Sequence, residues 1–137
     1  MANIVGIYRH ERSENFDEYF KAVGVPYIGR KMMAMSNPRM EIEQNGEKWT
    51  IRNVSAMRTN ELTFVPGMEY EESMPSGDVV KNVTDVIDGR LVTNSISPNG
   101  SRITRTYEFT PEGAILTMTH EASGQEAKRF YKRVVPT

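Results

Sequence analysis

The sequence predicts an all-β fold in which a series of short antiparallel strands, preceded by two short helices, closes or nearly closes into a barrel. From Met40 onward, β-prone runs alternate with turn dipeptides, and no helical pattern stands between the runs. The later turns recur every 11 to 13 residues, which is typical of strands joined by hairpins. Because such a meander has two edges that must be hidden, we expect the sheet to curl into a barrel.

The first helix is predicted by apolar residues at i, i+3, i+4 and i+7. These residues are Phe16, Tyr19, Phe20 and Val23. Asn15 is placed to cap the start of this helix, with Glu18 three residues later as in a capping box, and Gly24 supplies a left-handed stop. The pattern therefore predicts a short amphipathic helix with defined ends.

A second short helix is predicted after Pro26, from Tyr27 to Ser36. It ends at Asn37-Pro38, because the residue before a proline avoids the helical region of the backbone. Methionine is concentrated in this segment, at Met32, Met33 and Met35.

The strands that follow are predicted from turn dipeptides and from alternation. The dipeptides are Asn45-Gly46, Pro66-Gly67, Ser76-Gly77, Asp88-Gly89, Asn99-Gly100, Glu112-Gly113 and Ser123-Gly124. Between them, apolar and polar residues take opposite faces, so that Met40 and Ile42 oppose Glu41 and Glu43. One face of each strand is therefore expected to lie inside the barrel.

Two arginines interrupt these inner faces. Arg105 lies at two-residue spacing from the apolar members of its strand, which are Ile103, Tyr107 and Phe109. Arg129 and Tyr131 share one face of the last strand, while Phe130 takes the other. A guanidinium cannot shed its charge, and burying it without an anion costs several kcal/mol, on the order of magnitude known for buried ions. The pattern therefore indicates an anion inside the protein.

The source of that anion is open at this point. No acid stands out as a permanent partner of Arg105, and the acidic run Glu69, Glu71 and Glu72 is interpreted as a solvated turn. We therefore expect an anionic ligand in a partly wet cavity. The alternatives are that the arginines pair with internal acids, or that a β-bulge turns them outward.

Composition narrows the class of protein. A chain of 137 residues fits one domain, and 17 basic against 18 acidic residues gives a net charge of −1, so no basic field attracts nucleic acid. The absence of cysteine excludes disulfides, a thiolate nucleophile and a cysteine zinc site. The segment from Met1 to Arg12 has no long apolar run, so we expect neither a signal peptide nor a membrane span. A cytoplasmic protein is expected.

Catalysis is not predicted. His10 and His120 are the only histidines, and neither lies in a metal-binding or nucleophile motif. No glycine-rich phosphate loop is present, and no metal or cofactor is expected. A secreted lipocalin would share the barrel but normally brings a signal peptide and disulfides.

Several motifs in order along the chain resemble the intracellular lipid-binding proteins, the family of the fatty-acid-binding and cellular retinoid-binding proteins. They are Gly6-Ile7-Tyr8, Asn15-Phe16-Asp17, Tyr19-Phe20, Gly24-Val25, Arg30-Lys31, Asn37-Pro38, Asn60-Glu61-Leu62-Thr63-Phe64, Gly67, Glu69-Tyr70, Val80-Lys81 and Arg129-Phe130-Tyr131. Together they cover essentially the whole chain. The resemblance implies one domain, residues 1–137: a ten-stranded antiparallel up-and-down barrel capped by a helix-turn-helix lid at about residues 15–36.

The resemblance also implies a ligand site. The family's carboxylate anchor of two arginines and a tyrosine falls on Arg105, Arg129 and Tyr131. The cavity and portal fall on Phe16, Tyr19, Met32, Met33, Met35 and Met57. Met57 replaces the gating phenylalanine of many members, and the loop from Met74 to Asp78 lacks the basic residue common there.

Lys21, Arg30 and Lys31 lie on or beside the lid, where they could touch anionic membranes or form a nuclear-import signal; a solvated basic face is the alternative. We therefore expect a cytoplasmic and in part nuclear, monomeric, non-enzymatic carrier of a long-chain fatty acid or similar hydrophobic carboxylate. Retinoic acid is the alternative ligand, since Arg58-Thr59-Asn60-Glu61 and residues 114–119 resemble the retinoic-acid binders. A protein-interaction scaffold without lipid is the other alternative.

Overall fold

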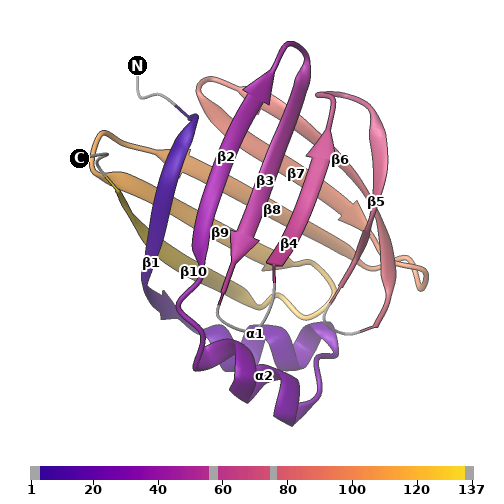
Figure 1. Ribbon diagram of the computed structural model, residues 1–137. Helices are drawn as coiled ribbons and strands as arrows, with labels where there is room; N and C mark the ends of the chain where they lie inside the picture. The colour runs from indigo at the N-terminus through magenta and orange to yellow at the C-terminus, as the bar shows by residue number, and fades with distance from the viewer. Residues whose placement is uncertain (1–3, 56–58, 75–76, 135–137) are drawn as a thin grey trace.

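The barrel is built from one antiparallel sheet that wraps around a common interior. The computed structural model describes residues 4–55, 59–74 and 77–134, in which ten strands form the sheet and two helices lie across one end of it (Figure 1). The predicted all-β fold with a helical lid is therefore confirmed.

The strands are β1 (Gly6–Glu14), β2 (Arg39–Asn45), β3 (Lys48–Val54), β4 (Thr59–Phe64), β5 (Glu69–Ser73), β6 (Val79–Ile87), β7 (Arg90–Ile96), β8 (Arg102–Phe109), β9 (Gly113–His120) and β10 (Glu126–Arg133). The helices are α1 (Phe16–Val23) and α2 (Tyr27–Ala34).

The strand order explains how the barrel closes. The hydrogen-bonded order is β4-β3-β2-β1-β10-β9-β8-β7-β6-β5, and β1 joins the N-terminal strands to the C-terminal half by pairing with both β2 and β10. Each neighbouring pair is antiparallel, as the meander predicted. β4 and β5 end the order, and they are the place where the barrel stays open.

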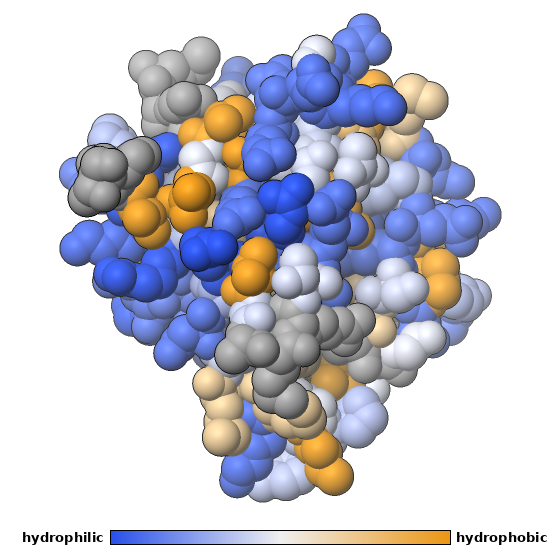
Figure 2. Space-filling view, viewed as in Figure 1, coloured by the Kyte–Doolittle hydropathy of each residue, from blue (hydrophilic) through white to orange (hydrophobic). Residues whose placement is uncertain are grey.

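Alternation separates the interior from the surface. Tyr8, Met40, Ile42 and Leu91 each expose 1% or less of their surface. Their neighbours along the strands, such as Glu41, face outward, and Figure 2 shows a mostly hydrophilic outer face over β2, β3 and β4 with scattered hydrophobic groups. The period of two thus defines the core as predicted.

The sequence predicted the C-terminal end of α1 correctly but not its N-terminal cap. Gly24 has a φ of 104° and its N–H reaches the carbonyl of Phe20 at 3.2 Å, so the left-handed stop is confirmed. The predicted cap by Asn15 is wrong: its φ is 51° and its side chain makes no cap hydrogen bond. Its Nδ2 instead donates to Gln125 Oε1 and to the carbonyl of Glu126, both at 2.8 Å. A tertiary contact to β10 has replaced the local one.

The turns follow the sequence with one informative exception. Asp88 and Gly89 both have positive φ, 50° and 75°, as a two-residue hairpin turn requires. Gly113, by contrast, is the first residue of β9, where a Cβ would stand 2.0 Å from the carbonyl oxygen of Tyr131. Glycine is needed there for close approach of two strands. The Ser76 half of the predicted Ser76-Gly77 turn lies outside the described residues.

The second helix ends earlier than predicted, at Ala34 instead of Ser36. Neither helix of the described part of the chain is long and apolar enough to cross a membrane.

Candidate functional site

The structure brings the three predicted anchor residues to the inner side of β8 and β10. β9 runs between these strands, and its Met118 and Leu116 face Arg105 and Arg129 in register. Tyr131 follows Arg129 on the same inner face and is 5% exposed. Both arginines therefore point inward, as alternation predicted, and no β-bulge turns them out.

Arg105 has a carboxylate partner that sequence reasoning missed. Its Nη2 lies 2.5 Å and its Nη1 3.3 Å from the two carboxylate oxygens of Glu72 on β5. The side chains are 11% and 16% exposed. The expectation that no acid pairs with Arg105 is wrong, and so is the reading of Glu72 as part of a solvated turn, because β5 is a strand that turns Glu72 inward.

This ion pair belongs to a network of hydrogen bonds on neighbouring strands. Asn82 Nδ2 donates to Glu72 at 2.7 Å, and Ser95 Oγ donates to Asn82 Oδ1 at 2.6 Å. Arg105 Nη2 also reaches Ser95 Oγ at 3.4 Å, which completes a ring of four side chains. Burial lowers the pKa of Arg105, but the charge and hydrogen bond of Glu72, together with Tyr107 and Tyr70, outweigh this effect, and the pKa stands above its usual value.

A second polar chain lies beside this ring. Tyr70 OH and Thr84 Oγ1 are 2.6 Å apart, and Thr84 Oγ1 and Thr93 Oγ1 are 2.7 Å apart. Asn82 and Thr84 are 0% exposed, so these polar groups lie in the interior and satisfy one another there.

Arg129 differs from Arg105 because the part of the chain that the structure describes offers it no acidic partner. Among the described residues, no carboxylate lies within 4.0 Å of its guanidinium, and its Nε is buried without a hydrogen-bond partner. The Phe16 ring centroid lies 5.5 Å from its guanidinium carbon. Burial raises the pKa of the adjacent Tyr131, although Arg129 opposes this, so its hydroxyl is a neutral donor. The two residues offer N–H and O–H groups to an anion.

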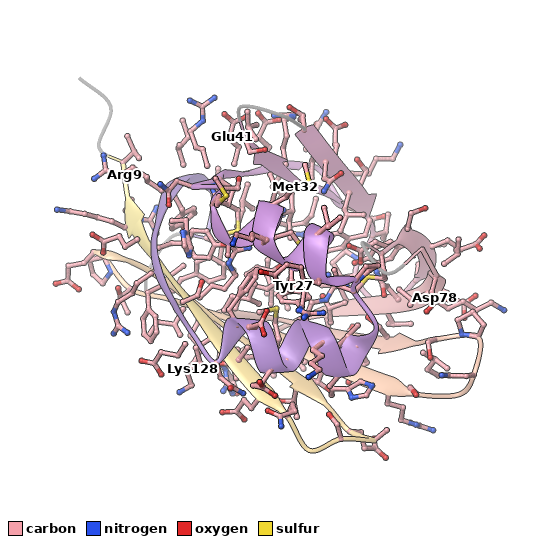
Figure 3. All side chains as sticks on the ribbon, turned by 90° about the horizontal axis from the view of Figure 1, so that it is seen from below. Arg9, Tyr27, Met32, Glu41, Asp78 and Lys128 are labelled. Carbon is pink, nitrogen blue, oxygen red and sulfur yellow. The ribbon has the colours of Figure 1, made fainter. Side chains whose placement is uncertain are left out.

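The lid residues divide into a packed set and an exposed set. Tyr19 is 1% exposed, with its pKa raised to about 12 by burial, while Phe16 and Met33 pack against the core. Met32 and Met35 are 47% and 78% exposed. Figure 3 shows the two helices side by side across the barrel end, with Tyr27 and Met32 on α2. Met57 lies outside the described residues.

The basic residues of the lid do not form one exposed triplet. Lys21 and Lys31 are exposed, but the Arg30 side chain is 11% exposed. Its Nε donates to Asp17 at 2.8 Å and its Nη1 to the carbonyl of Val25 at 2.7 Å. Arg30 therefore ties α2 to α1.

Glu72 could not be found from local pattern. The run from Glu69 to Glu72 shows no apolar alternation apart from Tyr70, and the pairing with Arg105 spans 33 residues. The one feature of the sequence that could have placed Glu72 on the inner face is its two-residue spacing from the aromatic Tyr70, which faces inward. Within the described ranges, no group of three or more acidic, histidine or cysteine side chains could hold a metal ion.

Comparison with known proteins gives similar chains of similar length. No family model matches the chain. A fatty acid-binding protein of Tyrophagus putrescentiae is 34% identical over 134 residues, which cover 97% of this chain and 99% of that protein. Cellular retinoic acid-binding protein 1 of Hippocampus comes is 36% identical over 138 residues, with the same coverage. The structure of a fatty-acid-binding protein from Drosophila melanogaster brain tissue superposes with a TM-score of 0.87 at 30% identity, covering 95% and 99% of the two chains.

Proposed function

The chain belongs to the family of the fatty-acid-binding and cellular retinoic-acid-binding proteins, and we propose that it binds and carries a long-chain fatty acid inside its barrel. The observation that carries this proposal is Arg129, an inward cation with no carboxylate partner among the described residues, beside the buried hydroxyl of Tyr131. Binding proteins of this family are carriers, so we propose no catalytic step and no cofactor. Residues 1–137 act as a single lipid-binding domain.

The two arginines have different roles in this proposal. The ligand carboxylate is held by Arg129 and the hydroxyl of Tyr131, each charge-assisted hydrogen bond contributing about 1.5–3 kcal/mol. Arg105 already has the Glu72 carboxylate at 2.5 Å. It acts on the ligand from a distance, through the hydrogen-bonded ring of side chains that it forms with Glu72, Asn82 and Ser95. The anchor is therefore centred on β10.

The tail supplies most of the gross binding energy. At about 0.8 kcal/mol per CH₂, a sixteen-carbon tail contributes roughly 12 kcal/mol before entropy and desolvation costs. Apolar side chains on the inner faces are available to contact it, among them Met40, Leu116 and Met118. The tail sets affinity and the carboxylate sets orientation.

Retinoic acid is the second candidate ligand, favoured by the 36% identity to a cellular retinoic acid-binding protein. It carries the same carboxylate, so the anchor alone does not separate it from a fatty acid. Displacement of a fluorescent fatty-acid probe from delipidated protein by oleate, all-trans retinoic acid and oleyl alcohol separates the classes. Displacement by an acid and not by the alcohol supports the carrier; no probe binding would favour a protein-interaction scaffold.

The anchor itself is tested by Arg129→Gln. We expect oleate to bind at least several-fold more weakly while methyl oleate binds nearly as before, because the ester makes no charge-assisted contact. Equal losses for acid and ester would refute the anchor.

Transfer of the ligand would involve the exposed side of α2. Tyr27 and Ile28 are 63% and 71% exposed there, and Met35, just after the helix, is 78% exposed. The exposed Lys31 belongs to the same helix. Apolar groups together with a basic charge suit transient contact with an anionic membrane. Arg30 does not join this contact, since Asp17 already pairs with it. We propose that the protein is found in the cytoplasm and in part in the nucleus. We also propose that it is a monomer.

A further inference from the structure

His10 lies on the inner face of β1, beside the proposed anchor. It stands opposite Tyr131 in the β1–β10 register, and the two ring centroids are 5.7 Å apart in an edge-to-face arrangement. Its backbone N–H donates to the carbonyl of Pro38 at 3.1 Å, and a register shift separates it from Arg12. The imidazole is thereby fixed next to the tyrosine that we assign to the ligand carboxylate.

Only one of the two imidazole nitrogens of His10 has a hydrogen-bond partner among the described residues. Nε2 lies 2.8 Å from Ser13 Oγ, whereas Nδ1 is buried and has no hydrogen-bond partner among the described residues. Arg129 Nε is buried and unpaired in the same way. Since buried polar atoms in folded proteins are nearly always hydrogen-bonded, two unpaired nitrogens beside one tyrosine point to a group that arrives with a ligand.

The charges around the His10 imidazole favour an anion as the ligand group that pairs with it. Burial lowers the pKa of His10, and the positive charge of Arg129 lowers it further. Polar interactions with the Asn37 side chain and the Arg12 backbone, neither of which forms a hydrogen bond to Nδ1, raise it. The neighbours of His10 on β10 are Arg129 and Tyr131, and its neighbours in the segment before β2 are Asn37 and Pro38. None of these described neighbours is acidic, so a bound carboxylate would bring a negative charge that they do not supply.

We propose that His10 is a third residue of the carboxylate site, donating its Nδ1–H to the ligand together with Arg129 and Tyr131. In the neutral ring Ser13 Oγ donates to Nε2, and in the imidazolium Nε2–H donates to Ser13 Oγ, so this bond fixes the ring in both protonation states. The inference rests on the proposed function. A carboxylate beside His10 offsets the repulsion from Arg129 and favours the imidazolium, so that binding of an acid, but not of an alcohol, is coupled to proton uptake by His10.

The test uses two variants of His10 and a matched control. His10→Leu removes the donor, His10→Asn keeps a donor near the position of Nδ1, and His120→Asn alters the other histidine, whose Nδ1 already bonds Ser123 Oγ at 2.7 Å. We expect His10→Leu to bind oleate roughly tenfold more weakly, with oleyl alcohol unaffected. His10→Asn should recover part of this loss, and His120→Asn should show none.

Nuclear magnetic resonance of labelled histidine gives an independent readout in the wild-type protein. The pKa of His10 should rise when oleate replaces oleyl alcohol, and the His120 signals serve as the internal reference. An unchanged or lower His10 pKa, or equal losses of acid and alcohol affinity in His10→Leu, would overturn the inference. If Arg129→Gln weakens oleate binding while His10→Leu does not, only the role of His10 fails; if wild type binds no oleate, the proposed function fails with it.

Discussion

Replacing Glu72 with glutamine removes the charge that neutralises Arg105 and leaves the side chain's size nearly unchanged. In the native protein the Glu72 carboxylate accepts from Arg105 at 2.5 and 3.3 Å and from Asn82 at 2.7 Å. Glutamine can keep part of this geometry, but it leaves a guanidinium inside the barrel with no opposite charge. We therefore expect Glu72→Gln to destabilise the ligand-free protein.

The magnitude follows from burial. Since the Arg105 and Glu72 side chains are 11% and 16% exposed, solvent screens the pair only weakly. Breaking a buried pair by removing one partner costs about 3–5 kcal/mol, and the hydrogen bonds that glutamine retains place this case near 3 kcal/mol. In a chain of this size, such a loss lowers Tm by roughly 10 °C.

The ligand should reverse much of this effect. An ionised carboxylate inside the barrel supplies the charge that Glu72 gave up, so oleate should bind Glu72→Gln more tightly than wild type and stabilise it more. Oleyl alcohol should not. Urea unfolding with and without each ligand measures both effects, because a ligand bound to the folded state adds RT ln(1 + [L]/Kd) to the free energy of unfolding.

Glu71→Gln is the matched control, since Glu71 is the residue before Glu72 in β5 and is exposed on the outer face. It should change the free energy of unfolding by less than about 0.5 kcal/mol. If Glu72→Gln were as stable as Glu71→Gln, or bound oleate more weakly than wild type, Glu72 could not be the internal counter-ion of Arg105.

Three further predictions follow from the described contacts. Gly113→Ala should destabilise the protein far more than Gly46→Ala, where no atom lies within 4 Å of the new Cβ and only backbone strain of about 1 kcal/mol is added; similar urea midpoints would contradict this. The pKa of His10 is lowered in the folded state, so the neutral ring contributes stability above about pH 6.5 that is lost at lower pH. The free energy of unfolding of His10→Asn should therefore fall less than that of wild type between about pH 7.5 and 5.5. An identical fall in the two proteins would contradict this prediction. Asn15→Ala should cost about 1–2 kcal/mol and speed hydrogen exchange in α1, because two hydrogen bonds to β10 and its turn are lost; unchanged exchange would show that these bonds do not hold the helix.

The sequence predicted well those features that depend on neighbours along the chain. The period of two in β8 and β10 was enough to turn Arg105, Arg129 and Tyr131 inward, because successive side chains of a strand alternate between faces. The same reasoning applies to Gly24, whose positive φ is a property of the residue itself.

Local reasoning failed where a distant strand supplied the partner. Asn15 is a residue type that commonly caps helices, yet its side chain donates to Gln125 and Glu126, which lie 110 and 111 residues away in sequence. The unpaired Nδ1 of His10 was likewise invisible, because a lone histidine carries no spacing signal until β1 is placed against β10.

By itself the sequence determined an antiparallel barrel with a helical lid and the inward direction of two arginines, since strand period, turn residues and helix ends are local properties. Only the tertiary structure decided which arginine is already neutralised. The register of β5 through β8 sets Glu72 against Arg105 and leaves Arg129, on β10, without a carboxylate among the described residues. The physical reason is that charge compensation acts through space over a few ångströms, and the distances that decide it are fixed by strand pairing between parts of the chain far apart in sequence.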